Sequence, residues 1–145
     1  MQPEHFLDLG RQLSKRDDAA ACRTAISRAY YAAYHVAAKM LKDCIGVSIP
    51  SAASGHAIVQ DYLTRCGDLK VAEVAKRVGD LYTDRISADY RLDTKRVETA
   101  RNARLRVDSA EVVVRALQKC SRDESRLNAM REVLRDARST RGRVR

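Results

Sequence analysis

The sequence contains little proline, glycine or aromatic residue. It has two prolines and six glycines in 145 residues, and aromatic side chains make up 5% of the chain. Proline and glycine interrupt helices, so their scarcity, together with abundant alanine, leucine, arginine and glutamate, favours long helices. No alternating β-branched run is long enough to form a sheet. The composition therefore predicts an all-α protein.

Long apolar segments are also missing. The chain has no apolar run of about 18 residues, the minimum for a membrane-spanning helix, and no apolar region behind a basic start. Its length suits a single domain with a substantial core. We therefore expect a soluble, cytoplasmic protein with no membrane span and no secretion signal.

Sequence motifs for the common cofactors and metals are absent as well. The phosphate-binding patterns GxxxxGK and GxGxxG do not occur, and neither does the GxSxG nucleophile elbow. The histidines His5, His35 and His56 are far apart, and no HExxH or Glu-x-x-His spacing brings ligands together. We therefore predict no metal site and no cofactor, and most hydrolase and transferase classes have no support.

The cysteines form neither a CxxC pair nor a Cys/His cluster, so nothing indicates a disulfide framework or a zinc site. Three of the four lie within helical apolar patterns, which predicts buried, reduced thiols in a cytoplasmic protein. The four residues are Cys22, Cys44, Cys66 and Cys120.

The charge of the chain is strongly positive. The formal net charge is +9, and arginine supplies 21 of the 28 basic residues. The planar guanidinium group suits phosphate, and nucleic acid is the commonest acidic partner of a basic domain. The composition therefore favours contact with nucleic acid or a nucleotide. A solvated basic surface, balanced by acidic residues elsewhere, is the alternative.

Apolar periodicity and helix-end signals predict six helices arranged as an up-and-down bundle of four to five, with one or two outlying helices. Asp17 or Asp18 can cap the second helix, and Gly46 can end it. Ser54 can cap the third helix, and Asp68 can start the fourth. The expected ranges are 3–15, 18–45, 55–65, 68–92, a fifth helix that ends near 120, and a sixth that begins at 121.

Two regions differ in composition. Residues 1–120 carry the pattern of the bundle, whereas residues 121–145 contain eight arginines and four acidic residues. Ser121 can cap a C-terminal helix, and residues 139–145 have no apolar face, which predicts a flexible tail. The arginine-rich segment is interpreted either as an arm that binds nucleic acid or as a solvated terminus.

Arg28 and His35 are the candidate catalytic residues. They are seven residues apart, about 700° of helical rotation, so they project from nearly the same face of one helix. An arginine can bind phosphate, and a histidine titrates near neutrality, which together are the minimum for metal-free RNA cleavage. The alternative for His35 is a histidine satisfied within the core or an interface.

Arg85 continues the apolar stripe of the fourth predicted helix, where an unpaired guanidinium group would be costly. Asp89, four residues later, can pair with it on the same face. Two interpretations follow: a buried Arg85–Asp89 brace between helices, or a phosphate-binding arginine that Asp89 orients.

Several aromatic residues and one histidine accompany these arginines. Tyr30, Tyr31, Tyr34 and Tyr90 are interpreted first as core or helix-contact residues whose hydroxyl groups can still reach polar partners. His56 follows the start of the third helix, where a structural first-turn role is the simplest interpretation. Tyr31, Tyr90 and His56 are nevertheless candidates, with Arg85, for binding phosphate or RNA.

Three segments, in order, resemble the HEPN-domain family (higher eukaryote and prokaryote nucleotide-binding). Residues 26–38, ISRAYYAAYHVAA, are similar to its SRAYYAxxHAA helix. Residues 55–59, GHAIV, resemble the GH start of its next helix, and residues 81–90, LYTDRISADY, resemble its LxxxRxxADY helix. The resemblance covers roughly residues 1–119 and excludes the arginine-rich end.

The resemblance implies a helical bundle that commonly forms a homodimer. Many members are metal-independent endoribonucleases of toxin–antitoxin, CRISPR-linked or phage-defence systems, and others are noncatalytic partners of a small nucleotidyltransferase. In the nucleases a histidine assists attack of the ribose 2′-hydroxyl on the adjacent phosphate, and an arginine stabilises the phosphate charge. By this resemblance, these roles fall on His35 and Arg28. The partners that the resemblance implies are RNA or a nucleotide, a second copy of the chain, and an antitoxin or nucleotidyltransferase.

Overall fold

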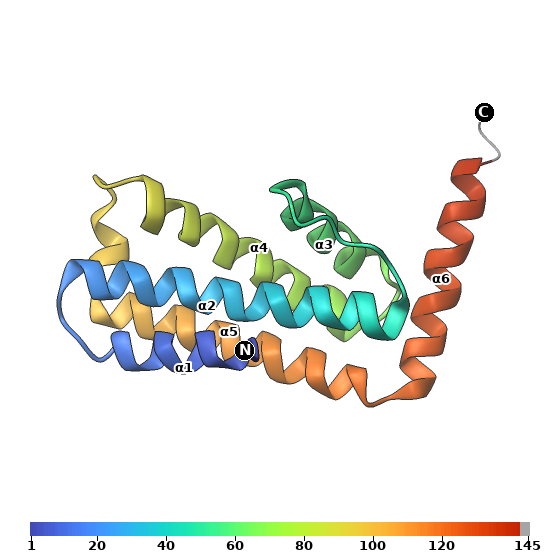
Figure 1. The fold of residues 1–145 in the computed structure, drawn as a ribbon, viewed down its shortest axis with the longest axis horizontal. Coiled ribbons are helices and arrows are strands. Elements are labelled where there is room, and N and C mark those ends of the chain that lie inside the picture. Colours follow the sequence, from blue (N-terminus) through green and yellow to red (C-terminus); the bar gives the residue numbers. More distant parts are fainter. Residues whose placement is uncertain (143–145) are drawn as a thin grey trace.

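The computed structural model describes residues 1–142, and within them the fold is all-α, as the sequence predicts (Figure 1). A π-helical turn, η1, extends α2, and a short 3-10 helix, η2, precedes α5. The elements are α1 (Glu4–Leu13), α2 (Ala19–Met40), η1 (Leu41–Ile45), α3 (Ser54–Arg65), α4 (Leu69–Tyr90), η2 (Lys95–Glu98), α5 (Ala100–Ser121) and α6 (Glu124–Gly142).

Helix α2 is the centre of the bundle. It packs against α1, α4 and α5, and α1 and α4 run in the opposite direction to α2 and α5 (Figure 1). Helix α3 packs mainly on α4, and α6 projects from the end of the bundle where α5 ends. The short helix α1 and the three 22-residue helices α2, α4 and α5 thus form the up-and-down core, with α3 and α6 outside it.

Local signals in the sequence set several helix ends. The carboxylate of Asp18 accepts a hydrogen bond from the Ala21 N–H, and that of Asp68 accepts one from the Val71 N–H. Gly46 ends the η1 turn with φ of 80°, a left-handed conformation that glycine adopts without strain. These three positions confirm the predicted end signals.

Other helix ends differ from the prediction. Ser54 is the first residue of α3 and provides no side-chain cap. Ser121 closes α5, where its hydroxyl donates to the Leu117 carbonyl, and Asp123 accepts from the Arg126 N–H at the start of α6. Helix α6 runs to Gly142, so it continues past residue 139, where a tail was predicted; residues 143–145 of that segment lie outside the described residues.

The base of α6 is fixed to the bundle by apolar and ionic contacts. Leu127, Met130 and Leu134 are buried. Arg126 donates to both oxygens of Asp68, at 2.7 and 2.9 Å, and this lowers the pKa of Asp68. The N-terminal cap of α4 is therefore also the anchor of α6.

The core is built on the small side chains of α2. Ala25, Ala29, Ala32, Ala33 and Ala37 are fully buried, so the neighbouring helices approach the α2 backbone closely. All four cysteines are free thiols; Cys44 is half-buried and the other three are buried, in line with the sequence.

A buried arginine joins α2 to the connection between α4 and η2. The guanidinium group of Arg23 donates to carboxylate oxygen Oε1 of Glu98 and to five backbone carbonyls, and the residue is 9% exposed. The carbonyls belong to Ser87, Ala88, Arg91, Leu92 and Thr94. The carbonyls of Ser87 and Arg91 also accept the backbone N–H groups of Arg91 and Thr94, so the guanidinium group adds to the backbone bonds at the end of α4 and in the connection that follows.

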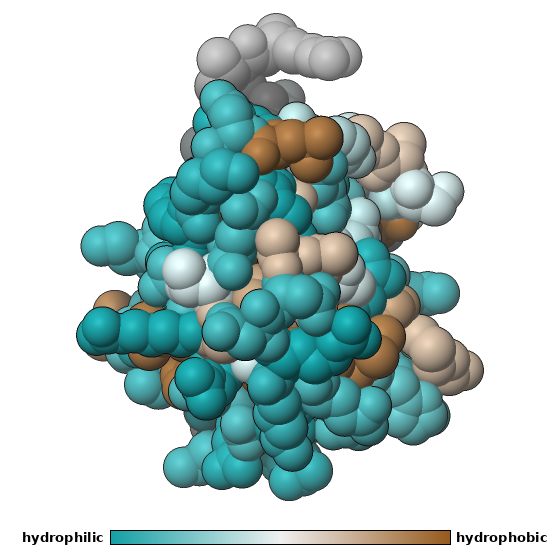
Figure 2. All heavy atoms as spheres, turned by 90° about the vertical axis from the view of Figure 1, so that its left-hand side faces the viewer, coloured by the Kyte–Doolittle hydropathy of each residue, from teal (hydrophilic) through white to brown (hydrophobic). Residues whose placement is uncertain are grey.

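The surface at this end of the bundle is mostly hydrophilic, with isolated hydrophobic side chains (Figure 2). Across residues 1–142, none of the helices combines the length and the apolar character needed to cross a membrane.

Candidate functional site

Phe6 brings Arg28 and His35 together on the surface of α2. The guanidinium carbon of Arg28 lies 5.2 Å from the centre of the Phe6 ring. The His35 imidazole stacks on the same ring, with the centres 5.8 Å apart and the planes at 17°. Arg28 is half-buried and His35 is exposed. The seven-residue spacing thus places both side chains against one aromatic ring.

The surroundings of His35 favour its neutral form. Partial burial against the neighbouring rings, and then the positive charge of Arg28, lower the pKa of His35 below its ordinary value. Tyr31 contributes to this packing, with its ring centre 6.0 Å from that of the imidazole. A neutral imidazole at physiological pH can accept a proton, as a general base must.

Arg85 lies in a cage of four tyrosine rings. Its guanidinium carbon is 5.4 to 5.7 Å from the four ring centres, and the residue is 5% exposed. The face of an aromatic ring attracts a cation, so the cage offsets part of the cost of burying this charge. The rings are those of Tyr30, Tyr31, Tyr82 and Tyr90.

Asp89 connects the two arginines through a serine. Nη1 of Arg85 is 3.8 Å from Oδ2 of Asp89, a long ion pair. The Ser27 hydroxyl donates to the same carboxylate oxygen at 3.1 Å and accepts from Nη2 of Arg28 at 3.2 Å. Helices α2 and α4 are thereby joined, which is the geometry of the predicted Arg85–Asp89 brace.

Each arginine also keeps a nitrogen without a hydrogen bond. Nε of Arg28 and Nε of Arg85 are buried and have no partner among residues 1–142. Buried donors are nearly always satisfied, and an unmade bond costs about 1–3 kcal/mol. The brace therefore leaves part of the hydrogen-bonding capacity of both guanidinium groups unused.

Gly55 fixes the start of α3 and with it the position of His56. A Cβ at Gly55 would overlap the Pro50 carbonyl oxygen and lie 2.8 Å from the Tyr34 hydroxyl. Glycine is therefore required at this close approach. Nδ1 of His56 is 2.5 Å from the Tyr30 hydroxyl, so α3 is hydrogen-bonded to α2 beside the tyrosine cage.

Burial controls the protonation of this pair. It raises the pKa of Tyr30 well above its ordinary value, so the phenol stays protonated. Burial, followed by the charges of Arg85 and His35, lowers the pKa of His56. The Tyr30 hydroxyl can donate to Nδ1 of the neutral imidazole, and this tautomer leaves the Nε2–H of His56 as a donor.

The candidate catalytic and phosphate-binding residues that the sequence predicts lie in one cluster, which α1, α2, α3 and α4 build. Tyr90 is 69% exposed and Tyr82 is 38% exposed, so the cluster reaches the surface. We call it the aromatic–arginine cluster: Phe6, Arg28, Tyr30, Tyr31, His35, His56, Tyr82, Arg85, Asp89 and Tyr90.

Phe6 and Tyr82 belong to the cluster although the sequence motifs do not specify them. Tyr82 precedes Arg85 by three residues, so helical spacing places both on one face and could have identified it. Phe6 belongs to the apolar stripe of α1, and no pattern distinguishes it from a core residue; only the packing of α1 on α2 brings it to Arg28.

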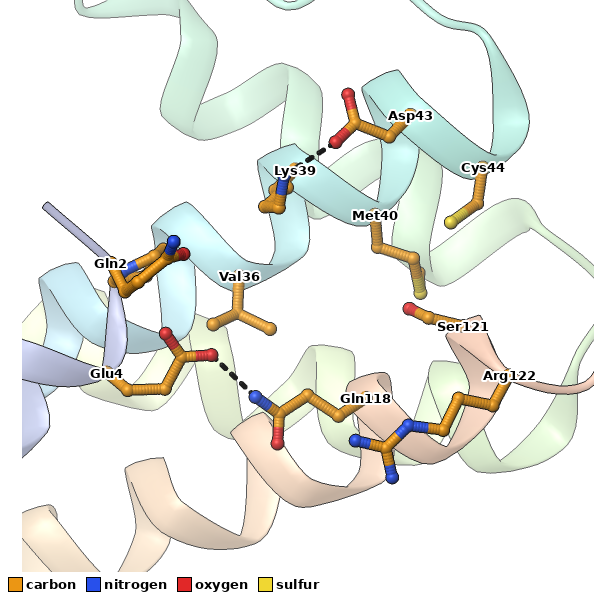
Figure 3. Close-up of a pocket in the computed structure, with 11 residues that line it drawn as sticks. Gln2, Glu4, Val36, Lys39, Met40, Asp43, Cys44, Gln118, Ser121 and Arg122 are labelled. Carbon is orange, nitrogen blue, oxygen red and sulfur yellow. Dashed lines mark hydrogen bonds and ion pairs between the residues drawn. The ribbon is translucent and has the colours of Figure 1, made fainter.

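A separate cavity of about 250 Å³ lies where the start of α1 meets the ends of α2 and α5 (Figure 3). Within it, Nε2 of Gln118 donates to Glu4 at 2.6 Å, and Lys39 donates to Asp43 at 2.8 Å. Its charged lining residues are two carboxylates and two cations, and Lys39 is paired with Asp43, so this cavity has no excess of positive charge and is a poorer site for an anion than the aromatic–arginine cluster.

Metal ligation finds no basis in the described part of the chain. Within residues 1–142, no three histidine, cysteine, aspartate or glutamate side chains come together as a set that could hold a metal ion.

The comparisons with known proteins identify no relative. No protein-family model matches the chain, and no curated protein or solved structure matches it either. The functional argument therefore depends on the cluster itself.

Proposed function

We propose that this protein acts on RNA as a HEPN-like, metal-independent endoribonuclease, with His35 as general base and Arg28 and Arg85 as phosphate-binding residues. The observation that carries the proposal is the contact of Arg28 and His35 with the same Phe6 ring. It places a phosphate-binding group and a proton acceptor against one aromatic ring.

In the proposed reaction, neutral His35 takes the proton of a ribose 2′-hydroxyl. The 2′-oxygen attacks the adjacent phosphorus while the bond to the 5′-oxygen breaks, and the leaving oxygen takes a proton from water. The products are a 2′,3′-cyclic phosphate and a free 5′-hydroxyl. Arg28, which is half-buried, stabilises the charge that develops on the phosphate oxygens.

The unused donors favour an anion at this place. Both Nε atoms are buried, so a phosphate oxygen would reach Nε of Arg28 or Arg85 only after the neighbouring side chains move, and it would then satisfy an unpaired donor. The exposed rings of Tyr82 and Tyr90 beside these arginines provide surfaces on which bases of a single strand can stack. Both contacts suit single-stranded RNA.

The experiment is cleavage of a labelled single-stranded RNA in the presence of EDTA. The wild-type protein is expected to cleave, and His35→Ala is expected to abolish cleavage while the helical circular dichroism stays unchanged. His5→Ala is the matched control, because His5 is exposed on α1 and has no part in the cluster. Cleavage by His35→Ala at the wild-type rate would refute the assignment of the base.

A noncatalytic RNA- or nucleotide-binding module is the second candidate. The observation that favours it is the enclosure of Arg85 by four tyrosine rings, which suits binding by charge and stacking without chemistry. It predicts binding of RNA at low salt without cleavage, and about tenfold weaker binding by Arg85→Met. Absence of RNA and nucleotide binding at low salt would exclude it.

The proposed partners follow from the same resemblance. A homodimer, an antitoxin or a small nucleotidyltransferase would fit a toxin–antitoxin or phage-defence role, and a basic helical surface could instead meet an acidic protein. Light scattering of the purified protein tests the dimer: a mass near that of one chain at micromolar concentration would contradict it.

A further inference from the structure

A cavity of about 170 Å³ opens between α3 and α4 beside the aromatic–arginine cluster. Tyr30, His56 and Tyr82 line it. The His56 ring centre is 5.6 Å from that of Tyr30 and 5.7 Å from that of Tyr82. Since both tyrosines also surround Arg85, the cavity and the arginine share two aromatic walls.

Other residues that line the cavity provide hydrogen-bonding groups. Nε2 of Gln60 donates to the Ala75 carbonyl at 2.6 Å, and among residues 1–142 no hydrogen bond reaches its Oε1. Gly79 lies against this amide, and a Cβ there would be 3.2 Å from Nε2 of Gln60. The cavity therefore combines flat apolar walls with an amide acceptor and the Nε2 donor of His56.

We propose that this cavity binds a nucleobase of an RNA strand whose backbone phosphate lies at the arginines of the cluster. A base has flat faces that stack on the aromatic walls and a polar edge that pairs with Gln60 and His56. An aliphatic ligand would leave both polar groups unpaired. The inference rests on the proposed binding of RNA and adds a base-recognition site to it.

The wild-type experiment compares two labelled strands of about 12 units: an oligoriboadenylate and an abasic ribose-phosphate chain of equal length. Loss of one stacked base costs about 1–3 kcal/mol, so the adenylate is expected to bind about tenfold more tightly than the abasic chain. Equal affinity for the two strands would overturn the base site and leave the proposed RNA binding intact. Failure of both strands to bind would overturn both proposals.

Ala57→Leu tests whether the base binds in this cavity. Ala57 lines the cavity and is exposed, so leucine fills the cavity without disturbing the core. The variant is expected to lose the preference for the adenylate and to keep its affinity for the abasic chain. Ala20→Leu, at an exposed alanine on α2, is the matched control and is expected to keep the preference. Retention of the preference by Ala57→Leu would refute this location.

A measurement on the wild-type protein keeps the inference testable if the variant does not fold. Adenosine monophosphate is expected to shift the NMR signals of the His56 ring strongly, through ring contact, whereas ribose 5-phosphate, which has no base, is expected to shift them much less, through the charge near Arg85 alone. Equal shifts with both ligands, or none with adenosine monophosphate, would overturn the proposal.

Discussion

The guanidinium group of Arg23 binds one carboxylate oxygen of Glu98 through two nitrogens, Nε at 3.0 Å and Nη2 at 2.7 Å. The carboxylate is thereby held beside the connection from α4 to α5, and its pKa is lowered, first by this hydrogen bond. The other nitrogen, Nη1, donates to carbonyls at the end of α4. One side chain of α2 thus organises the segment that follows Tyr90 of the cluster.

Replacing Arg23 with alanine is expected to destabilise the fold. The change removes the guanidinium donor from the buried Ala88 carbonyl and from the part-buried Leu92 carbonyl, a cost of about 3 kcal/mol. Urea denaturation followed by circular dichroism measures it. Arg16→Ala is the control, because Arg16 is exposed and its contact with Asp18 is a surface ion pair. Equal midpoints for the two variants would show that the carbonyls do not depend on Arg23.

The pKa of His35 is expected to respond to Arg28. In the wild-type protein it lies below about 6.5, the ordinary value of histidine, because of partial burial and the charge of Arg28. Arg28→Gln removes the charge and keeps the burial, so the pKa should rise and remain below the ordinary value. NMR titration of the His35 imidazole measures this pKa in the wild-type protein and in Arg28→Gln. Arg77→Gln, an exposed change on α4, should leave it unaltered; an unchanged pKa in Arg28→Gln would contradict the coupling.

Stability is expected to increase with pH in the window just below about 6.5, the ordinary pKa of histidine. The pKa values of His35 and His56 are lowered in the folded protein, so the unfolded chain binds more protons in this window. Raising the pH therefore favours the folded state, and the gain ends above the ordinary histidine value. Urea midpoints at constant ionic strength measure the slope.

The control for this pH dependence is the double variant His35→Gln and His56→Gln. It removes both lowered histidines, so its midpoints should vary less with pH than those of the wild-type protein over the same window. An equal slope in the two proteins would assign the pH dependence to other groups.

Gly55→Ala is expected to lower stability and to disturb the hydrogen bond between His56 and Tyr30. The added methyl group collides with the Pro50 carbonyl and the Tyr34 hydroxyl, so the start of α3 must move. Thermal unfolding measures the loss, and the His56 NMR signals report the displacement. Gly142→Ala, where a Cβ meets nothing within 4 Å, should leave stability unchanged or slightly higher. Equal stability of both variants would contradict the close approach.

Helix periodicity explains why the sequence located so much of the candidate site. Arg28 and His35 share a face because seven residues make nearly two turns, and Arg85 and Asp89 meet because they are four apart. The same local rules failed at Ser121, where the hydroxyl bonds back to the Leu117 carbonyl instead of capping α6. A serine can satisfy either arrangement, and only the path of the chain selects one.

The sequence by itself determined the all-α class, the caps at Asp18 and Asp68, and the common face of Arg28 and His35, because these depend on hydrogen bonds and spacings within a few residues. Tertiary structure alone decided which rings surround Arg85, that Phe6 supports both candidate catalytic residues, and that Arg23 binds carbonyls more than 60 residues away. These contacts join separate helices, and packing of side chains in three dimensions selects them.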